Sequence, residues 1–397
     1  MATTRQPIPR IPRTVWALGL VSLFMDISSE TIHALLPLFL TATLGASVAL
    51  VGLIDGVAEA TASIAKVFSG YLSDRLRKRK VLILIGYGLA AVTKPLFALA
   101  GSPAVVFGAR FADRIGKGLR GAPRDALVAD VTPPEIRGRA FGLRQSLDTI
   151  GAFAGPLLAI GLMAILANDM RMVFWIAVIP AALAVACVLF GVEDAPAARA
   201  PVGAPPIRLI DLKRLPSAFW NVTLVGVVFT LARFSEAFLI LKASAEGLPL
   251  VLAPLVLVVM NAVYALGAYP AGIWSDRVPA RRLFGLGLLA LIAADLALGL
   301  LSGLGGAFLG IALWGVHMAL TQGLLAKLVA DHAPADLRGS AFGAFNLLTG
   351  VAMLFASVIA GLVWDRFGAN ATFLVGAGFA AVALLIAAQL RTVSEII

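Results

Sequence analysis

The sequence predicts an all-α membrane protein whose twelve transmembrane helices form two pseudo-symmetric halves of six helices each. Three observations predict this fold class: the composition, the spacing of the apolar runs and an internal repeat. Of the 397 residues, 60% are hydrophobic and only 14% are charged, and the mean hydropathy is +0.95. A soluble domain averages roughly 45–50% apolar and about 25% charged residues. Polar side chains cannot cover the surface of such a chain, so its solvent is lipid.

The apolar residues fall into runs long enough to cross a bilayer as helices. A spanning helix needs roughly 20 mostly apolar residues. The runs are continuous, which disfavours the strands of a membrane barrel, since those alternate over about ten residues. The predicted spans are 14–44, 48–72, 81–100, 103–128, 140–166, 172–192, 218–242, 250–274, 283–302, 306–329, 340–364 and 371–390.

The basic residues alternate between loops, and this alternation predicts the orientation. Lys and Arg collect in short cytoplasmic loops. Here they precede the first span and follow the second, fourth, sixth and eighth, while the other loops hold few. Both termini are therefore predicted to be cytoplasmic, in a plasma (inner) membrane protein. The same pattern explains the net charge of +10 without a nucleic-acid partner.

Two segments of the first half recur in the second half at a nearly constant spacing. Residues 70–75 (GYLSDR) return as 272–277 (GIWSDR), 202 residues later, and 130–142 (DVTPPEIRGRAFG) return as 331–343 (DHAPADLRGSAFG), 201 residues later. Parallel repeats of six helices are typical of transporters, with the binding site at the repeat interface.

A polar stretch rich in Pro and Ala lies at the midpoint of the chain. Such a composition indicates a linker. The predicted organisation is an N-terminal half over 1–192, a cytoplasmic linker over 193–217 and a C-terminal half over 218–397.

Short motifs add a family resemblance. Gly70, Asp74 and Arg75, followed by basic residues at 77–80, resemble the loop signature of the major facilitator superfamily. The chain is similar to that family over nearly its whole length, with Arg114 and Gly118 resembling its fourth-helix arginine motif. The resemblance implies alternating access, with cytoplasmic gating residues at Gly70, Asp74, Arg75, Asp276 and Arg277.

The fifth predicted span carries a further resemblance. Gly151, Gly155 and Pro156 are similar to the family's antiporter motif, although Leu157 and Leu158 follow in place of further glycines. This resemblance favours antiport.

Charged residues recur inside the predicted spans. A charge at the centre of a spanning helix costs roughly 2.5–3.5 kcal/mol on insertion scales, so such residues are functional candidates by default. On the first helix, Asp26, Glu30 and His33 lie within about 60° of one another at about 100° per residue. Because coupling to protons needs a group that changes charge, we predict Asp26 and Glu30 as proton-coupling residues, with Arg110 as their partner.

The resemblance also places the first, fourth, seventh and tenth helices around one central cavity. The residues predicted to line it, with a fifth-helix pair one turn apart added, are His33, Arg110, Arg114, Lys117, Arg144, Asp148, Arg233, Glu236 and His317.

Structural interpretations of several charges stay open beside the functional ones. The Arg144/Asp148 and Arg233/Glu236 pairs can neutralise each other within their helices, and His317 can be a hydrogen-bonded core residue. Asp55 near the outer end can be hydrated. Arg120 and Arg124 are expected to extend to the cytoplasmic surface.

The predicted function is secondary active transport of a small solute, with proton-coupled efflux first. No G-x-x-x-x-G-K-[ST] sequence indicates direct drive by ATP. One cysteine and three scattered histidines exclude a metal centre, and we predict no cofactor and no enzymatic activity. The partners are the solute, protons and membrane lipid, with the protein acting as a monomer.

Alternatives to that function remain. One is uptake or export of an anionic metabolite or metal chelate, favoured by the cationic fourth helix. Amphipathic drugs fit the antiporter motif, and the acidic first helix permits a cation. A non-transporting assembly or sensor protein of transporter fold is the alternative from another class.

Overall fold

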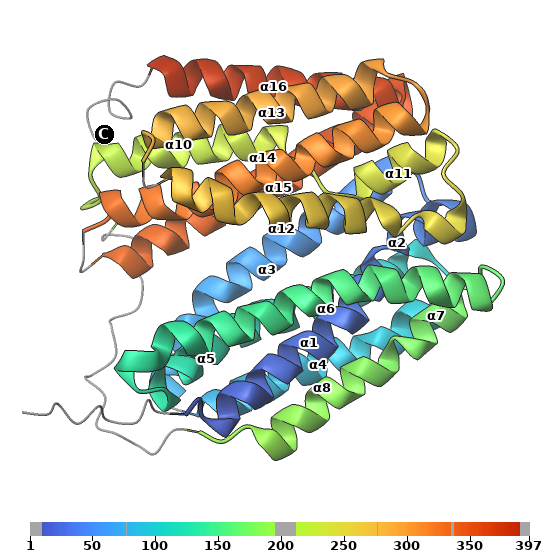
Figure 1. The fold of residues 1–397 in the computed structure, drawn as a ribbon. Helices are drawn as coiled ribbons and strands as arrows, with labels where there is room; N and C mark the ends of the chain where they lie inside the picture. The colour runs from blue at the N-terminus through green and yellow to red at the C-terminus, as the bar shows by residue number, and fades with distance from the viewer. Residues whose placement is uncertain (1–9, 77, 195–211, 276, 335–336, 390–397) are drawn as a thin grey trace, which may run out of the picture.

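The computed structural model describes residues 10–76, 78–194, 212–275, 277–334 and 337–389. In this part of the chain the elements are helices, and Figure 1 shows them as two groups of long, roughly parallel rods. The first group is blue to green and the second is yellow to red. These are the N-terminal and C-terminal halves.

The N-terminal half contains six spans, two of which are interrupted. Its elements are α1 (Arg13–His33), α2 (Leu36–Leu38), η1 (Phe39–Thr43), α3 (Val48–Leu76), α4 (Arg79–Leu99), α5 (Pro103–Val131), η2 (Pro134–Ile136), α6 (Arg137–Ile165), α7 (Met170–Ile176) and α8 (Val178–Gly191).

The C-terminal half repeats this plan. Its elements are α10 (Ser217–Ala232), α11 (Ala237–Ala245), η3 (Leu250–Leu252), α12 (Leu255–Ser275), α13 (Ala280–Leu300), α14 (Gly303–His332), α15 (Arg338–Phe367) and α16 (Ala369–Gln389). Most of the predicted linker, 195–211, lies outside the described residues.

The membrane prediction is confirmed. Eleven helical segments of the described chain are long and apolar enough to cross a bilayer. The twelfth predicted span is α5, which has the length but carries charged residues throughout. The chain is an integral membrane protein with one unusually charged span inside its bundle.

Two interruptions of the spanning helices follow from proline. A proline removes an N–H donor and its ring clashes with the carbonyl four residues earlier. Pro37 lies four residues after His33, where α1 ends, and Pro180 lies four residues after Ile176, where α7 ends. The third interruption, between α10 and α11 at 233–236, contains neither proline nor glycine.

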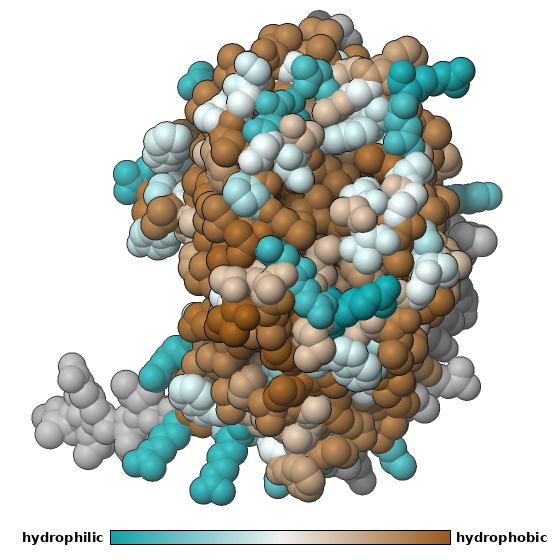
Figure 2. Space-filling view, turned by 90° about the vertical axis from the view of Figure 1, so that its right-hand side faces the viewer, coloured by the Kyte–Doolittle hydropathy of each residue, from teal (hydrophilic) through white to brown (hydrophobic). Residues whose placement is uncertain are grey.

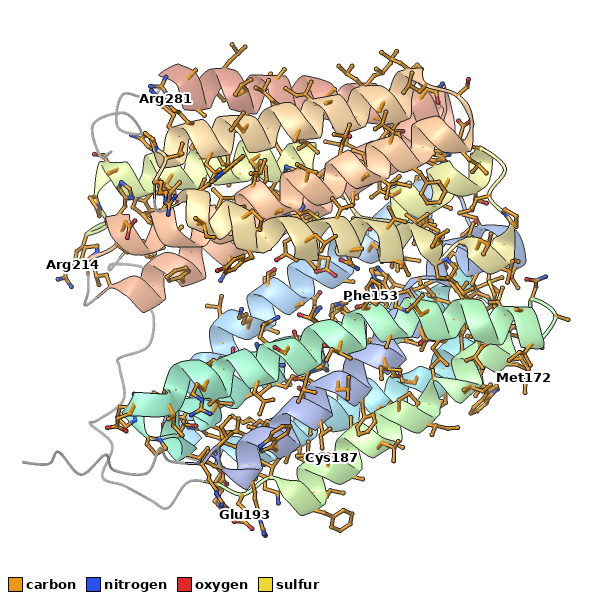
Figure 3. All side chains as sticks on the ribbon, viewed as in Figure 1. Phe153, Met172, Cys187, Glu193, Arg214 and Arg281 are labelled. Atoms are coloured by element: carbon orange, nitrogen blue, oxygen red, sulfur yellow. The ribbon has the colours of Figure 1, made fainter. Side chains whose placement is uncertain are left out.

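The two ends of the bundle differ. We call the end where α1 begins, α8 ends and α10 begins the linker end; Figure 3 shows Glu193 and Arg214 there, with Met172 at the opposite, closed end. At the closed end the halves contact each other along α3 and α15. The carboxylate of Asp365 accepts hydrogen bonds from the backbone N–H groups of Val48 (3.0 Å) and Ala49 (2.9 Å) of the other half. Figure 2 looks onto this end, where hydrophilic side chains are interspersed among hydrophobic ones.

Glycines make this seam between the halves possible. A Cβ added to Gly52 would overlap the carbonyl oxygen of Ser357, and one added to Gly361 would lie 2.6 Å from Cα of Ala49. Side chains at these positions would separate the helices, so the glycines allow a backbone-to-backbone seam. The seam runs from the closed end to about the middle of the bundle.

We therefore predict that Gly52→Ala opens the closed end. Overpacking costs about 1–3 kcal/mol, which corresponds to a roughly 5–150-fold shift between two conformations. Spin labels at Ala164→Cys and Ala245→Cys, in a Cys187→Ser background, should report longer distances in the variant. Gly108→Ala is the matched control because a Cβ there meets no atom within 4 Å. Identical distance distributions for Gly52→Ala and the parent would contradict the prediction.

Candidate functional site

A cavity of about 350 Å³ lies between the halves, where the α3–α15 seam ends. The N-terminal half contributes side chains of α3, and the C-terminal half contributes side chains of α10, α14 and α15. The lining residues are Glu59, Ser63, Phe229, Thr230, Arg233, Leu325, Phe342, Phe345, Asn346, Thr349, Gly350 and Met353. Ligand sites of 300–1,000 Å³ are typical for small molecules.

Two carboxyl groups face each other within the N-terminal half, and neither belongs to the lining of this cavity. Asp26 of α1 and Asp148 of α6 lie within hydrogen-bonding range of each other. Asp148 also faces Arg144 at 3.6 Å and Arg124 at 3.7 Å. This part of the N-terminal half therefore joins a pair of carboxyl groups to two guanidinium groups.

Glycines of the antiporter-like motif place α6 against the acidic face of α1. A Cβ on Gly151 would lie 2.6 Å from the carbonyl oxygen of Leu23 and 3.0 Å from Cβ of Asp26. One on Gly155 would lie 2.8 Å from Cβ of Glu30. Small residues let spanning helices approach closely, so these two glycines position both predicted proton-coupling residues.

Glu30 has a different partner from Asp26. Its Oε2 lies 3.4 Å from Nδ1 of His33, one turn further along α1. The other charges that act on Glu30 come from Lys117 and Arg114 of α5. The shared face predicted for Asp26, Glu30 and His33 therefore exists, but it divides into a carboxyl pair and a carboxyl–imidazole pair.

The basic residues of α5 are mostly matched by acids. Nη2 of Arg110 lies 3.4 Å from Oδ1 of Asp55, and Nη1 of Arg114 lies 3.5 Å from Oε1 of Glu59. The prediction that Arg110 partners Asp26 and Glu30 is therefore corrected. Its side chain is 3% exposed and directed at α3, because α3 presents Asp55 and Glu59 one turn apart to the packed face of α5.

Two further expectations about charges are corrected. Asp55, for which hydration was one open interpretation, is buried against Arg110 and accepts a hydrogen bond from Ser235 Oγ at 2.8 Å. Arg120, expected at the surface, is 6% exposed, and its guanidinium lies 4.4 Å from the centre of the Tyr87 ring. Arg124 likewise turns inward and donates to Ser22 Oγ at 3.1 Å. Internal acceptors and a π face replace water for these cations.

Arg144 and Asp148 pair as an i, i+4 couple and also belong to a larger network. Arg144 Nε lies 3.9 Å from Oδ1 of Asp125, which Arg124 contacts at 3.2 Å. The interpretation as an isolated neutral pair does not describe this arrangement, because α5 and α6 share these charges across their interface.

In the C-terminal half, the interruption between α10 and α11 presents Arg233 to the cavity. Glu236 lies at the other side of the interruption, and the charges acting on it come from Arg233, His33, Glu30 and Glu59. The interruption is held across the halves: the Ser235 hydroxyl donates to Asp55, and the Ser235 N–H donates to Ser357 Oγ at 3.3 Å.

His317 does not line the cavity. It is fully buried inside the C-terminal half, between the rings of Phe229 and Trp314, with Nδ1 3.1 Å from the carbonyl oxygen of Gly287. This corrects its predicted place, because the neighbouring aromatic side chains cover the face of α14 that carries it.

The predicted gating residues are only partly described. Gly70, Asp74 and Arg75 fall in the last turns of α3, and their own side chains lie outside the described set. Asp276 lies outside the described residues. Arg277 is exposed after the end of α12, at the linker end. Their gating role stays a prediction.

Sequence reasoning missed a buried ion pair between α4 and α5. Nζ of Lys94 lies 2.9 Å from Oδ1 of Asp113 and 2.9 Å from Ser29 Oγ. Each residue could have been noticed as a charge within a predicted span. The spacing along the chain, however, does not show that Lys94 of one helix contacts Asp113 of the next. Among the described residues no group of His, Cys, Asp and Glu has a metal-binding arrangement.

Comparisons with known proteins agree with this architecture. The family model described as Major Facilitator Superfamily matches residues 18–352 and 252–395. An uncharacterized MFS-type transporter of Methanocaldococcus jannaschii is 30% identical over 384 residues, covering 95% of this chain and 94% of the relative. The multidrug resistance protein MdtH of Salmonella typhi is 26% identical, covering 81% of this chain and 79% of that protein.

Solved structures show the same fold at low sequence identity. A bacterial homologue of the human lysosomal transporter Spinster, in an inward-facing and unoccupied conformation, has a TM-score of 0.77 at 16% identity, covering 98% of this chain and 99% of that chain. The nucleoside transporter NupG has a TM-score of 0.77 at 15% identity, covering 94% of this chain and 98% of that chain. The repeat, the cavity between the halves and the match to the family model lead to one conclusion: the chain belongs to the major facilitator superfamily of membrane transporters.

Proposed function

We propose that this protein is a proton-coupled secondary transporter that exports a small solute by alternating access. The observation that carries the coupling is the Asp26–Asp148 carboxyl pair, which joins α1 and α6 inside the N-terminal half. A proton held there changes the charge next to Arg124 and Arg144. That charge change is the kind of local event that can bias a two-state equilibrium.

Alternating access is supported by the asymmetry of the bundle. The closed end is sealed by the backbone seam of α3 and α15, while the cavity lies beyond the seam toward the linker end. Opening the closed end requires the loss of the Asp365 hydrogen bonds to Val48 and Ala49 and of the Asp55–Ser235 contact. These few polar contacts are weak enough to break and re-form in a working cycle.

Export is supported by the glycine motif at 151–156 and by similarity to a multidrug resistance protein. We place the protein in the plasma (inner) membrane as a monomer, with both termini and the linker end cytoplasmic. Gly70, Asp74 and Arg75, with Asp276 and Arg277, then form the cytoplasmic gate. In this orientation the structure is the state closed to the outside.

The proposal is tested in proteoliposomes that contain a trapped pH-sensitive dye. Adding a transported solute to one side should move protons to the other side, and an imposed pH gradient should drive solute accumulation. Solute exchange without any proton movement would exclude proton coupling, and the absence of both fluxes across a broad solute panel would exclude transport.

Orientation is tested separately in intact cells. In the Cys187→Ser background, Lys213→Cys at the linker end should react with an impermeant maleimide only after the membrane is opened. Ala245→Cys at the closed end is the counterpart and should react without opening. The reverse pattern would invert the proposed direction of the cavity.

A further inference from the structure

We infer that the cavity binds an amphipathic organic anion, with its anionic group on Arg233 and its apolar or aromatic body on the phenylalanines of α10 and α15. This inference rests on the proposed function and names the substrate class. It follows from three features of the cavity: one unpaired cation, one acid already paired, and an aromatic wall.

Arg233 is the unpaired cation. Its side chain lines the cavity at the interruption after α10 and is partly exposed there. Among the described residues no acid lies within ion-pair distance of it and none of its nitrogens has a hydrogen-bond acceptor, while Glu236 and Glu59 act on it from further away. A guanidinium presents its donors in a fork that fits a carboxylate or a phosphate with two hydrogen bonds. An unsatisfied arginine in a membrane cavity is costly unless a ligand supplies that partner.

The acid that lines the same cavity is already engaged. Glu59 lies 3.5 Å from Nη1 of Arg114, and Lys117 of α5 also acts on it. A cationic substrate would therefore compete with two fixed cations for Glu59 while being repelled by Arg233. An anionic substrate meets neither obstacle, so the charge pattern selects anions over cations.

The rest of the wall favours a ring. Phe229, Phe342, Phe345 and Met353 line the cavity together with Leu325. Aromatic side chains prefer to pack against other rings in offset or edge-on geometry. Asn346 and Thr349 of α15 add neutral polar groups that can orient a substituent. The cavity thus combines a single anion-binding group with an apolar wall, the usual composition of a small-molecule site.

The test uses three probes of nearly the same shape: 2-naphthoate, 2-naphthamide and 2-naphthylmethylammonium. Binding to the purified full chain in nanodiscs is measured by calorimetry, without any proton gradient. We expect the naphthoate to bind at least about tenfold more tightly than the other two, as one charged hydrogen-bonded pair provides. Tighter binding of the ammonium probe, or no preference for the naphthoate, would overturn the inference.

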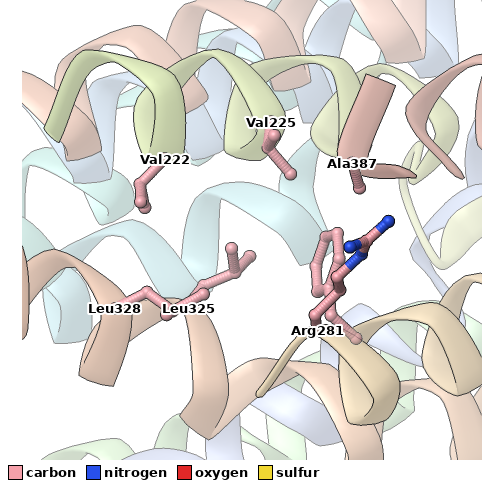
Figure 4. A pocket seen from close by; sticks show the side chains of 7 residues that line it. Val222, Val225, Arg281, Leu325, Leu328 and Ala387 are labelled. Atoms are coloured by element: carbon pink, nitrogen blue, oxygen red, sulfur yellow. The ribbon is translucent and has the colours of Figure 1, made fainter. Parts of the chain in front are cut away.

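Variants assign the preference to Arg233. Arg233→Gln should remove it, and Arg233→Lys, which keeps the charge but not the fork, should keep part of it. The matched control is Arg281→Gln, in the same half at the linker end. Arg281 lines a separate, small cavity with Val222, Val225 and Ala387 (Figure 4) and donates to the carbonyl oxygen of Ala388 at 2.7 Å. A preference that survives in Arg233→Gln but is lost in Arg281→Gln would place the anion elsewhere.

Failure of this inference and failure of the proposed function are distinguishable. A protein that binds naphthoate through Arg233 but moves no solute in proteoliposomes would retain the anion site and exclude the transport role. A protein that transports a cation in exchange for protons and does not bind naphthoate would retain the proton-coupled transport role and exclude the anion site.

Discussion

Asp26→Asn is expected to abolish proton-driven solute accumulation while leaving substrate binding intact. A coupling site must gain and lose a proton within the working pH range, and an amide cannot do so. Asp26 and Asp148 lie within hydrogen-bonding range beside Arg124 and Arg144. In the variant, Asp148 faces an amide instead of a second carboxyl group and remains paired with the two arginines. The measurement is accumulation under an imposed pH gradient, compared with exchange at equal pH.

Glu30→Gln is the informative companion variant. Glu30 occupies the same face of α1 but pairs with His33 instead of with a second carboxyl group. We expect Asp148→Asn to reproduce the loss seen for Asp26→Asn, and Glu30→Gln to reduce the rate while some gradient-driven accumulation remains. If Asp26→Asn accumulates solute with the pH dependence of the parent protein, the carboxyl pair is structural. The coupling group is then Glu30 or Glu236.

The second large effect concerns thermal stability. Replacing either of two buried aspartates, Asp113 or Asp295, by valine should change the stability of the protein in opposite directions. Asp113→Val leaves the ammonium of Lys94 without its partner in a site where both side chains are almost fully buried. Breaking a buried ion pair in this way costs about 3–5 kcal/mol. We therefore expect a large loss of thermal stability in detergent.

Asp295→Val should act in the other direction. Asp295 is 0% exposed, and neither carboxylate oxygen has a hydrogen-bond partner in the described chain. Its Oδ2 lies against Gly376, 2.8 Å from where a Cβ would stand. An unsatisfied buried polar group costs about 1–3 kcal/mol, so an apolar side chain should stabilise the protein by up to that amount. Equal destabilisation by Asp113→Val and Asp295→Val would contradict this prediction.

The internal repeat shows that Asp113 and Asp295 occupy different positions of the repeated unit. Lys94 and Asp295 are 201 residues apart, and so are Asp113 and Trp314, which is the spacing of the second pair of repeated segments. The N-terminal half therefore has an ion pair where the C-terminal half has an aspartate and a tryptophan. The Trp314 Nε1–H also lacks a partner among the described residues. The two halves therefore place side chains at equivalent positions, but only the N-terminal half pairs them in the described chain.

The prediction of the spans succeeded because it depends on local chemistry. An apolar run of about 20 residues has no other stable solvent than lipid, whichever helices it packs against. Pro37 and Pro180 likewise interrupt their helices through a clash with the carbonyl four residues earlier. The span that departs from this rule is α5, whose charges are tolerated because charged groups of α3, α4 and α6 pack against it.

By itself, then, the sequence determined the helical membrane fold, its repeat, and which side chains carry charge within the bilayer. Only the tertiary structure decided which of those charges meet. Helical angles place residues on a face, but they contain no information about the neighbouring helix. Arg110 therefore pairs with Asp55 instead of Asp26, and His317 is enclosed by aromatic rings. The interruption at 233–236 contains neither proline nor glycine, and other helices hold it: Ser357 Oγ accepts from the freed Ser235 N–H, and Asp55 accepts from the Ser235 hydroxyl.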